Sequence, residues 1–308
     1  MKGIKAVEDN SITWIKDLWI KDPPKLNYGL SFLEVPFDYA VSSRPGARFG
    51  PKAILEALNS LSATNLDRRV DLSKIPIFHM GSVLPNHNFK LAYESIYKAA
   101  LKTPHNYTLV TLGGDHSITD PLLRAIQEQH SSKKIGLVMI DAHLDCREPI
   151  IGNEHSGHWV HTASDIICFK NMVQLGASSP LYNLSYIDKL EKNGVMIKTP
   201  SEIRRSGTFL FEEISTQLRN TDGLYITLDI DALDQAFAPG TSVPASHGLY
   251  PQEVFDIVFH LAKNYPIFGF DITEVSPPLD ENFKTVQLAA MILQQFWAGY
   301  ALRNYKIN

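Results

Sequence analysis

The sequence predicts an α/β fold, in which helices cover both faces of a mostly parallel sheet. Short runs of apolar and β-branched residues alternate along the chain with amphipathic stretches that are long enough to be helices. Parallel strands buried on both faces have such continuous apolar runs, and parallel neighbours are joined by helical crossovers. The length of 308 residues and the 44% share of apolar residues suffice for one large core. We therefore expect a single domain over residues 1–308, with an N-terminal extension over residues 1–25.

The individual elements follow from the apolar pattern. Runs rich in Val, Ile, Leu and aromatic residues predict strands over residues 28–35, 107–112, 135–140, 224–228 and 267–270. Amphipathic stretches predict helices over residues 50–60, 90–101, 121–129, 209–219 and 251–264, and Pro51 falls in the first turn of the earliest of them. Residues 286–302 are the most apolar stretch, but Gln294 and Gln295 interrupt them. Because a membrane span needs about 20 clean apolar residues, this stretch is predicted to be a buried helix.

The composition indicates which classes of partner to exclude and in which compartment the protein resides. The chain has 29 basic and 33 acidic residues, a formal charge of −4 and no Lys/Arg stripe, so we expect no nucleic-acid partner. Residues 1–22 mix charged and apolar residues, unlike a signal peptide. Two cysteines, Cys146 and Cys168, are too few for a disulfide framework. These observations predict a cytoplasmic protein that does not associate with a membrane.

Polar side chains follow four of the predicted strands, at residues 113–117, 141–145, 229–231 and 271–274. In open α/β sheets, ligands bind outside the carboxyl ends of the strands, where these loops converge. We therefore expect the Asp, His and Glu side chains of the four segments to meet at one edge of the sheet.

Six of these side chains have the spacing of a metal centre. Residues 141–145 present ligand-type side chains at every second position, and an extended backbone directs alternate side chains to one side. Four carboxylates would repel one another unless cations neutralise them, and two divalent ions supply the matching charge. Oxygen-rich ligation with imidazole and no thiolate favours manganese. The six candidate ligands are His116, Asp141, His143, Asp145, Asp229 and Asp231.

Any one of these residues alone could instead cap a helix or close a turn, and Gly113 and Gly114 are expected to form the tight turn that presents His116. The six together favour the metal centre. Two metal ions that share a water lower its pKa and make it a nucleophile, so we expect hydrolysis of a phosphate ester, an amide or a guanidine.

Four motifs resemble those of the ureohydrolases, which include arginase, agmatinase and formimidoylglutamase. They are GGDHS at 113–117, DAHLD at 141–145, TLDIDALDQAFAPGT at 227–241 and FDITEVSPPLD at 270–280. VPFD at 35–38 and RPGARFGP at 44–51 extend the resemblance. It implies a three-layer α/β/α fold around about eight strands, a homotrimer or homohexamer, and two Mn²⁺ ions per subunit on the same six residues.

The resemblance also implies a substrate class. Family members hydrolyse a C–N bond at the carbon of a guanidinium or amidine group. Glu274 would hold the guanidinium or amidine group, and Asp145 would orient the nucleophile and transfer a proton. The RPGARFGP and FAPGT segments look more like agmatinase than arginase, so the predicted reaction converts agmatine to putrescine and urea. The alternatives are a formimidoylglutamase that acts on an acidic amidine and a catalytically inactive metal-binding homologue.

Arg147 leaves the substrate open. The DAHxDxR form also occurs in formimidoylglutamases, where the Arg could bind a substrate carboxylate, and in archaeal agmatinase-like members. Arg147 could equally form a salt bridge away from the pocket. Residues 148–154 and 174–186 are the loops expected to set specificity.

The proton-shuttle histidine of many family members is displaced here. The segment EHSGHW at 154–159 offers two candidates, His155 and His158. We assign the catalytic role to His158, which follows a glycine, and a substrate-binding role to His155. Either could instead be a solvated loop residue.

Overall fold

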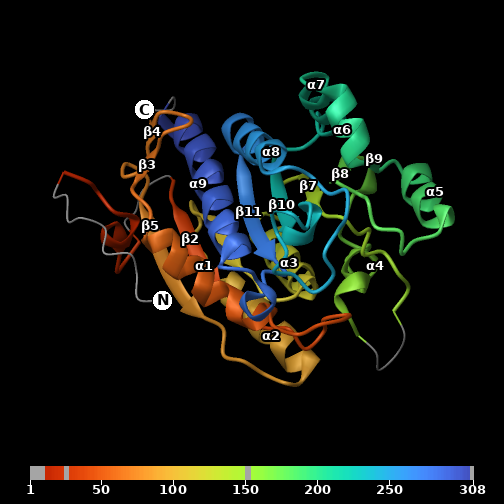
Figure 1. Ribbon diagram of the computed structural model, residues 1–308, viewed down its shortest axis with the longest axis horizontal. Helices are drawn as coiled ribbons and strands as arrows, with labels where there is room; N and C mark the ends of the chain where they lie inside the picture. The colour runs from red at the N-terminus through yellow and green to blue at the C-terminus, as the bar shows by residue number, and fades with distance from the viewer. Residues whose placement is uncertain (1–10, 24–27, 150–153, 306–308) are drawn as a thin grey trace.

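The computed structural model describes residues 11–23, 28–149 and 154–305, and it confirms the α/β fold (Figure 1). Nine strands form one sheet in the order β1-β5-β2-β6-β11-β10-β7-β8-β9, and its neighbouring strands are parallel. The strands are β1 (Trp19–Ile20), β2 (Leu30–Glu34), β5 (Ile77–Ser82), β6 (Thr108–Leu112), β7 (Ile135–Ile140), β8 (Met172–Leu175), β9 (Met196–Lys198), β10 (Gly223–Asp229) and β11 (Ile267–Thr273).

The sheet has one strand more than the resemblance implied. The edge strand β1 is only two residues long and pairs with β5. It lies in the expected N-terminal extension, of which residues 1–10 and 24–25 are outside the described residues. A separate two-stranded antiparallel sheet is formed by β3 (Thr64–Asn65) and β4 (Val70–Asp71).

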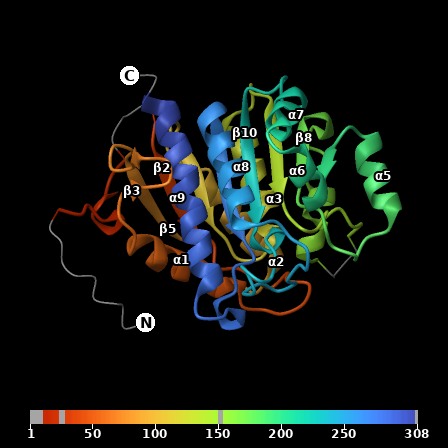
Figure 2. The ribbon, with the colours of Figure 1, turned by 45° about the horizontal axis from the view of Figure 1, so that its top comes forward.

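Helices cover both faces of the large sheet, which makes three layers (Figures 1 and 2). Among them, α8 and α9 lie side by side on one face, and α2 packs with α3 on the other. The α-helices are α1 (Gly50–Asn59), α2 (Phe89–Ala100), α3 (Thr119–Gln129), α4 (Trp159–Thr162), α5 (Leu184–Lys192), α6 (Pro200–Ser206), α7 (Phe209–Gln217), α8 (Pro251–Asn264) and α9 (Lys284–Tyr305).

Alternation along the central strands divides the interior into two apolar cores. In β7, Val138 and Ile140 join the core under α1, α8 and α9, whereas Leu137 and Met139 join the core under α2 and α3. Successive side chains of a strand point to opposite faces, so a strand between two helical layers is apolar at every position. This is why the sequence pattern identified β6, β7, β10 and β11.

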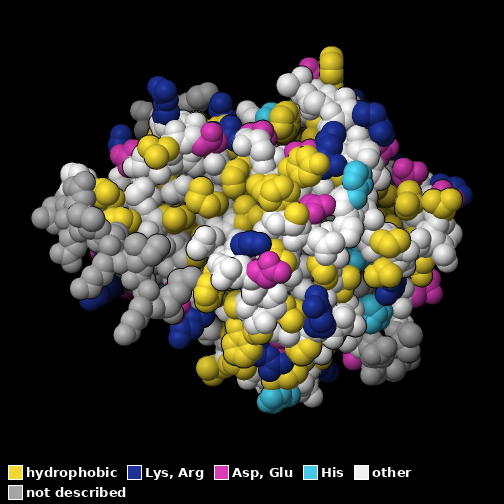
Figure 3. Space-filling model, viewed as in Figure 1, with side chains coloured by type: hydrophobic (Ala, Val, Ile, Leu, Met, Phe, Trp, Pro, Cys, Tyr) yellow, Lys and Arg dark blue, Asp and Glu magenta, His cyan; other side chains and the backbone are white. Residues whose placement is uncertain are grey.

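The apolar C-terminal stretch forms the buried helix α9, as predicted. Gln294 is accommodated because its Nε2 donates to the carbonyl oxygen of Ser62 at 3.0 Å. Gln295 accepts from Nε of Arg68 at 3.0 Å. Among the described residues, we find no helix with the length and apolarity needed to cross a membrane. Figure 3 shows Lys and Arg side chains interspersed with Asp and Glu on one face of the molecule.

The four strands that carry the polar segments are neighbours at the centre of the sheet, in the order β6-β11-β10-β7. Because they are parallel, their carboxyl ends lie at the same edge. The fold therefore brings the four segments together there.

Candidate metal centre

The turn after β6 positions His116. Gly114 passes so close to the preceding loop that a Cβ atom at this position would lie 1.7 Å from the carbonyl oxygen of Phe37. Asp115 then caps the 3₁₀ turn by accepting from the backbone N–H of Ser117 at 3.0 Å, and its other oxygen accepts from the N–H of Ala40 at 2.9 Å. The turn expected from the sequence is present, and residue 114 must be glycine because a side chain has no room there.

Two strand ends present their aspartates in the same way. After β7, Oδ1 of Asp141 accepts from the N–H of His143 at 2.6 Å. After β10, Oδ1 of Asp229 accepts from the N–H of Asp231 at 2.9 Å. In each pair the first carboxylate uses one oxygen to shape its turn, and its Oδ2 is directed to the cluster.

The six predicted ligands converge. Nδ1 of His116 lies 3.0 Å from Oδ2 of Asp141, 3.3 Å from Oδ2 of Asp145 and 3.2 Å from Oδ2 of Asp229. Nδ1 of His143 lies 3.0 Å from Oδ2 of Asp231 and 3.6 Å from Oδ1 of Asp141. Two groups of ligand atoms result, one from His116, Asp141 and Asp145 and one from Asp141, His143 and Asp231, with Asp141 in both.

The buried carboxylates of this cluster repel one another. Burial and the neighbouring carboxylates raise the pKa of four acids above their ordinary values: Asp145, Asp229, Asp231 and Glu274. Burial lowers the pKa of His143, but Asp231 and Asp141 outweigh burial and raise it to about 12. So many buried carboxylates remain ionised together only if positive charge accompanies them.

Unsatisfied polar atoms indicate that a bound cation supplies this positive charge. Among the buried side-chain atoms of the described residues that have no hydrogen-bond partner, four belong to the cluster and to Glu274: Nδ1 of His116, Oδ2 of Asp141, Oδ1 of Asp231 and Oε2 of Glu274. The three carboxylate oxygens around His116 lie near Nδ1 without the geometry of hydrogen bonds. Leaving such atoms unpaired is costly, and a divalent cation among them removes that cost. The residues therefore fit a pair of metal ions.

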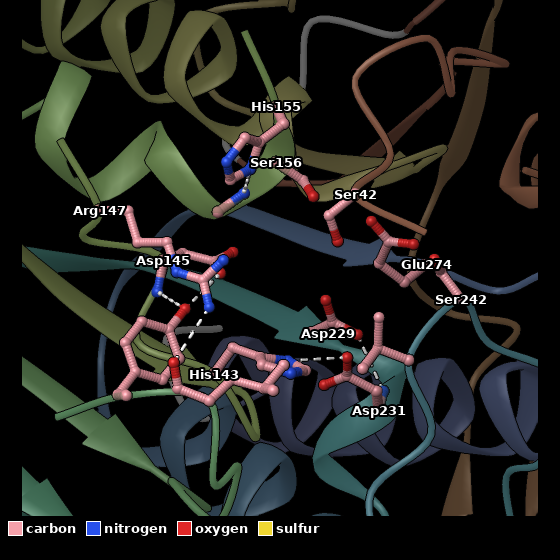
Figure 4. A pocket seen from close by; sticks show the side chains of 14 residues that line it. Ser42, His143, Asp145, Arg147, His155, Ser156, Asp229, Asp231, Ser242 and Glu274 are labelled. Atoms are coloured by element: carbon pink, nitrogen blue, oxygen red, sulfur yellow. Dashed lines mark hydrogen bonds and ion pairs between the residues drawn. The ribbon is translucent and has the colours of Figure 1, made fainter. Parts of the chain in front are cut away.

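The cluster forms one wall of a pocket (Figure 4). Glu274, which follows β11, lines it with a buried carboxylate whose Oε1 accepts from the N–H of His116 at 3.1 Å. Its other oxygen, Oε2, is the unpaired one. Uncharged residues also line the pocket: Ser42, Ser156, Gly157, Leu181, Tyr182, Ser242 and Val243. Of these, Ser42, Ser242 and Val243 lie outside every segment named in the sequence analysis.

Arg147 lines the same pocket on the side opposite Glu274 (Figure 4). Its Nη2 donates to the carbonyl oxygen of Leu181 at 3.1 Å, and its guanidinium carbon lies 4.9 Å from the centre of the Tyr182 ring. Within the described ranges, no acidic side chain forms an ion pair with it. The expected alternative, a salt bridge away from the pocket, is therefore not observed.

The two candidate shuttle histidines have different surroundings. His155 lines the metal pocket, and its Nδ1 accepts from the N–H of Gly157 at 3.1 Å. His158 is buried and lines a second cavity, which His155 also lines, so it is not a solvated loop residue. Burial lowers the pKa of His158 to about 4. Of the two histidines, His155 is the one that lines the metal pocket, and the catalytic role of His158 stays a prediction.

Comparison with known proteins identifies the family to which the chain belongs. A sequence model described as the arginase family matches residues 28–298. A formimidoylglutamase of Halalkalibacterium halodurans is 27% identical, with 90% of this chain and 88% of that protein covered. A mitochondrial agmatinase of Gallus gallus is 31% identical, with 85% and 78% covered. The crystal structure of formimidoylglutamase from Bacillus subtilis superposes with a TM-score of 0.89 at 26% identity, with 98% and 96% covered. The chain belongs to the arginase family.

Proposed function

We propose that this protein hydrolyses a C–N bond of an amidino or guanidino group at a pair of divalent metal ions. The six converging side chains would hold the ions, with Asp141 contributing to both groups. A donor set of carboxylate oxygens and imidazole nitrogens without thiolate favours Mn²⁺. When bound, the metal pair supplies Lewis-acid activation of water at neutral pH.

Glu274 is the residue best suited to bind the amidino group. Its Oε2 is buried, unpaired and on the pocket wall beside the cluster. A planar cation with N–H donors is the natural partner of such an oxygen, because a charge-assisted hydrogen bond offsets the cost of burying the carboxylate. Bound in this way, the amidino carbon would face the metal ligands.

Asp145 is the proposed proton carrier. Its carboxylate lines the pocket, and burial and Asp141 raise its pKa. From this position, Asp145 would take a proton from the nucleophile and give it to the leaving nitrogen. His155 lines the same pocket as Arg147 and would contact the remainder of the substrate.

The substrate that the geometry supports best has a carboxylate at its far end. Glu274 and Arg147 lie on opposite sides of the pocket, so the pocket has an anionic end and a cationic end (Figure 4). An acidic amidine such as formimidoylglutamate, or a guanidino acid, matches both ends. Agmatine would bring a second cationic amine toward Arg147, with a repulsion of charges. The single observation that carries this proposal is the position of Arg147 in the pocket.

Agmatine hydrolysis is the second candidate, because the RPGARFGP and FAPGT segments resemble agmatinase. The structure gives the first segment a scaffolding role: Asp38 accepts from the N–H of Gly46 at 2.7 Å and pairs with the Arg48 side chain. A scaffold shared with agmatinases is compatible with either substrate.

A panel of substrates tests the proposal. Protein reconstituted with Mn²⁺ is assayed for formamide release from formimidoylglutamate and for urea release from guanidinobutyrate and agmatine. We expect turnover of an acidic substrate and little turnover of agmatine. Arg147→Ala should raise KM for the acidic substrate roughly 10- to 100-fold, the equivalent of about 1.5–3 kcal/mol for hydrogen bonds to a charged group.

The matched control is Arg219→Ala, since Arg219 is an exposed arginine outside the pocket. It should leave KM unchanged. Turnover of agmatine alone, with the same KM in Arg147→Ala, would assign the protein to agmatine and refute the carboxylate site. Release of neither formamide nor urea from any substrate would favour the inactive homologue.

A further inference from the structure

A chain of buried side chains leads from His116 into the sheet, away from the carboxylate cluster. Nε2 of His116 lies 2.8 Å from Oγ1 of Thr227, and Oγ1 of Thr227 lies 2.6 Å from Oδ1 of Asp271. Thr227 and Asp271 are register partners on the neighbouring strands β10 and β11. All three residues are fully buried, so water does not substitute for these contacts.

Asp271 is surrounded by hydroxyl groups. Besides Thr227, the hydroxyl of Tyr225 lies 2.5 Å from Oδ2 and the hydroxyl of Thr119 lies 3.1 Å from it. An ionised carboxylate only accepts hydrogen bonds, and each hydroxyl has a single proton to donate. Burial raises the pKa of Asp271 above its ordinary value, and His116 and the three hydroxyl donors offset only part of this increase. Three donors around one carboxylate are the arrangement that suits its charged form.

The direction of each hydrogen bond follows from this count. The proton of the Thr227 hydroxyl is directed to Asp271, so the bond between Thr227 and His116 needs its proton from the ring. Nε2 of His116 therefore carries the N–H. A neutral imidazole has one N–H, which leaves the lone pair on Nδ1. Nδ1 is the atom that faces Asp141, Asp145 and Asp229.

We propose that Asp271, acting through Thr227, holds His116 in the one tautomer that can bind a cation. Asp271 and Thr227 are positioning residues, because neither touches the pocket. The inference rests on the metal centre of the proposed function. Partners on the far side of a ligating histidine typically contribute 10- to 100-fold to metal affinity.

Asp271→Asn reverses the direction of the hydrogen bond between residue 271 and Thr227, with little change in the shape of the side chain. Tyr225 and Thr119 still offer two donors at the Oδ2 position, so the amide oxygen takes that position and the amide NH₂ faces Thr227. The Thr227 hydroxyl is then released to donate to Nε2 of His116 or to Oγ1 of Thr119, which lies 3.3 Å away. When it donates to Nε2, the ring N–H moves to Nδ1 and blocks the ligand atom. Thr227→Val removes the hydroxyl, and Thr227→Ser retains it.

The test is the affinity of each metal-free variant for Mn²⁺, from the electron paramagnetic resonance signal of free Mn²⁺ during titration. Asp271→Asn and Thr227→Val should each raise the Kd roughly 10- to 100-fold, and Thr227→Ser should keep the Kd of the natural protein. Thr111→Val is the control, because Thr111 is a buried threonine on β6 whose hydroxyl has no partner among the described residues. Its Kd should not change.

The Tm of each metal-free variant separates positioning from stability. If these residues only tie the strands together, Tm falls while the Kd stays constant, and the inference is overturned. Equal Kd values for Thr227→Val and Thr227→Ser overturn it too, even if Asp271→Asn fails to fold. If the natural protein itself binds no Mn²⁺, the metal centre is refuted, and this outcome is distinct from a variant without effect.

Discussion

At the scale of single residues, the pocket contains two side chains on strained backbone. Asp145 has φ of 42° and Glu274 has φ of 61°, in the left-handed region that disfavours residues with a Cβ atom. Such strain persists only where the surroundings impose it, and it concentrates at functional sites. At Glu274 the N–H donates to the carbonyl oxygen of Gly114 at 2.8 Å, which fixes the turn and aims the carboxylate.

Removing the charge of Glu274 should therefore impair substrate binding and leave the fold intact. Glu274→Gln keeps the shape but loses the charge-assisted hydrogen bond to the amidino group, so kcat/KM should fall roughly 10- to 100-fold. Steady-state kinetics with the acidic substrate measure this. The control is Glu281→Gln, because Glu281 is exposed on the surface. Unchanged kinetics in Glu274→Gln would show that Glu274 does not bind the substrate.

The two cysteines should differ sharply in reactivity. Cys168 is exposed, whereas Cys146 is buried, and burial with the nearby Asp145 raises the pKa of Cys146 to about 11. Only the thiolate reacts, so at pH 8 about one Cys146 in a thousand is reactive, and its alkylation should rise as pH approaches 11. Iodoacetamide at pH 8 followed by peptide mapping should find label on Cys168 alone. Equal labelling of both would contradict the buried position.

Sequence reasoning reached the ligands but could not choose between neighbours in a loop. The spacing of residues 141–145 predicted converging side chains on the assumption of an extended backbone. The side chains do converge, but through a turn in which Asp141 accepts from the N–H of His143 and Asp145 has φ of 42°. The orientations of Arg147, His155 and His158 depend instead on contacts with distant residues. Arg147, for example, is held by Leu181 and Tyr182, more than 30 positions away. No local pattern encodes such contacts, although Tyr182 falls in the segment expected to set specificity.

At the scale of elements, the sequence identified strands that helices cover on both sides and missed others. β6 and β10 are buried at every position and read as continuous apolar runs. β5 was missed because His79 and Gly81 interrupt it, and most of its positions are partly or fully exposed. β8 and β9 are only four and three residues long, too short for a period to emerge.

The turn between β6 and α3 is the element whose geometry matters most for the metal centre. In Gly114→Ala the new methyl group would overlap the carbonyl oxygen of Phe37, so the turn must move and carry His116 with it. We expect a lower Tm and a loss of Mn²⁺ binding, measured by calorimetry and metal titration. Gly207→Ala is the control, because its Cβ meets nothing within 4 Å, and only its φ of 52° makes it costly. Wild-type Mn²⁺ affinity in Gly114→Ala would contradict this account.

At the scale of the whole molecule, one cluster of charge should govern stability as a function of pH. In the metal-free protein, burial raises the pKa of Asp229 and Glu274. The native state then binds more protons than the unfolded state above the ordinary carboxyl pKa of about 4, so the free energy of unfolding falls as pH rises. His143 acts in the same direction, because its pKa is raised to about 12 and its contribution, complete below about 6.5, is lost as pH rises.

Bound Mn²⁺ should reverse this dependence, since metal ligands must be deprotonated and metal affinity rises with pH. The Tm of metal-free protein should therefore decrease between about pH 5.5 and 8.5, and the gain in Tm from Mn²⁺ should increase over the same range. Differential scanning calorimetry at several pH values checks both trends. A metal-free Tm that rises with pH would show that the cluster is not crowded as described.

The central claim is that six side chains from three strand ends hold two metal ions, and metal content tests it most directly. Metal-free protein is dialysed against Mn²⁺ at neutral pH, and manganese and protein are quantified. The account predicts two Mn²⁺ per chain, a loss of at least one in Asp141→Ala because Asp141 belongs to both ligand groups, and two again in Asp188→Ala on the surface. Fewer than two ions in the natural protein, or two in Asp141→Ala, would contradict it.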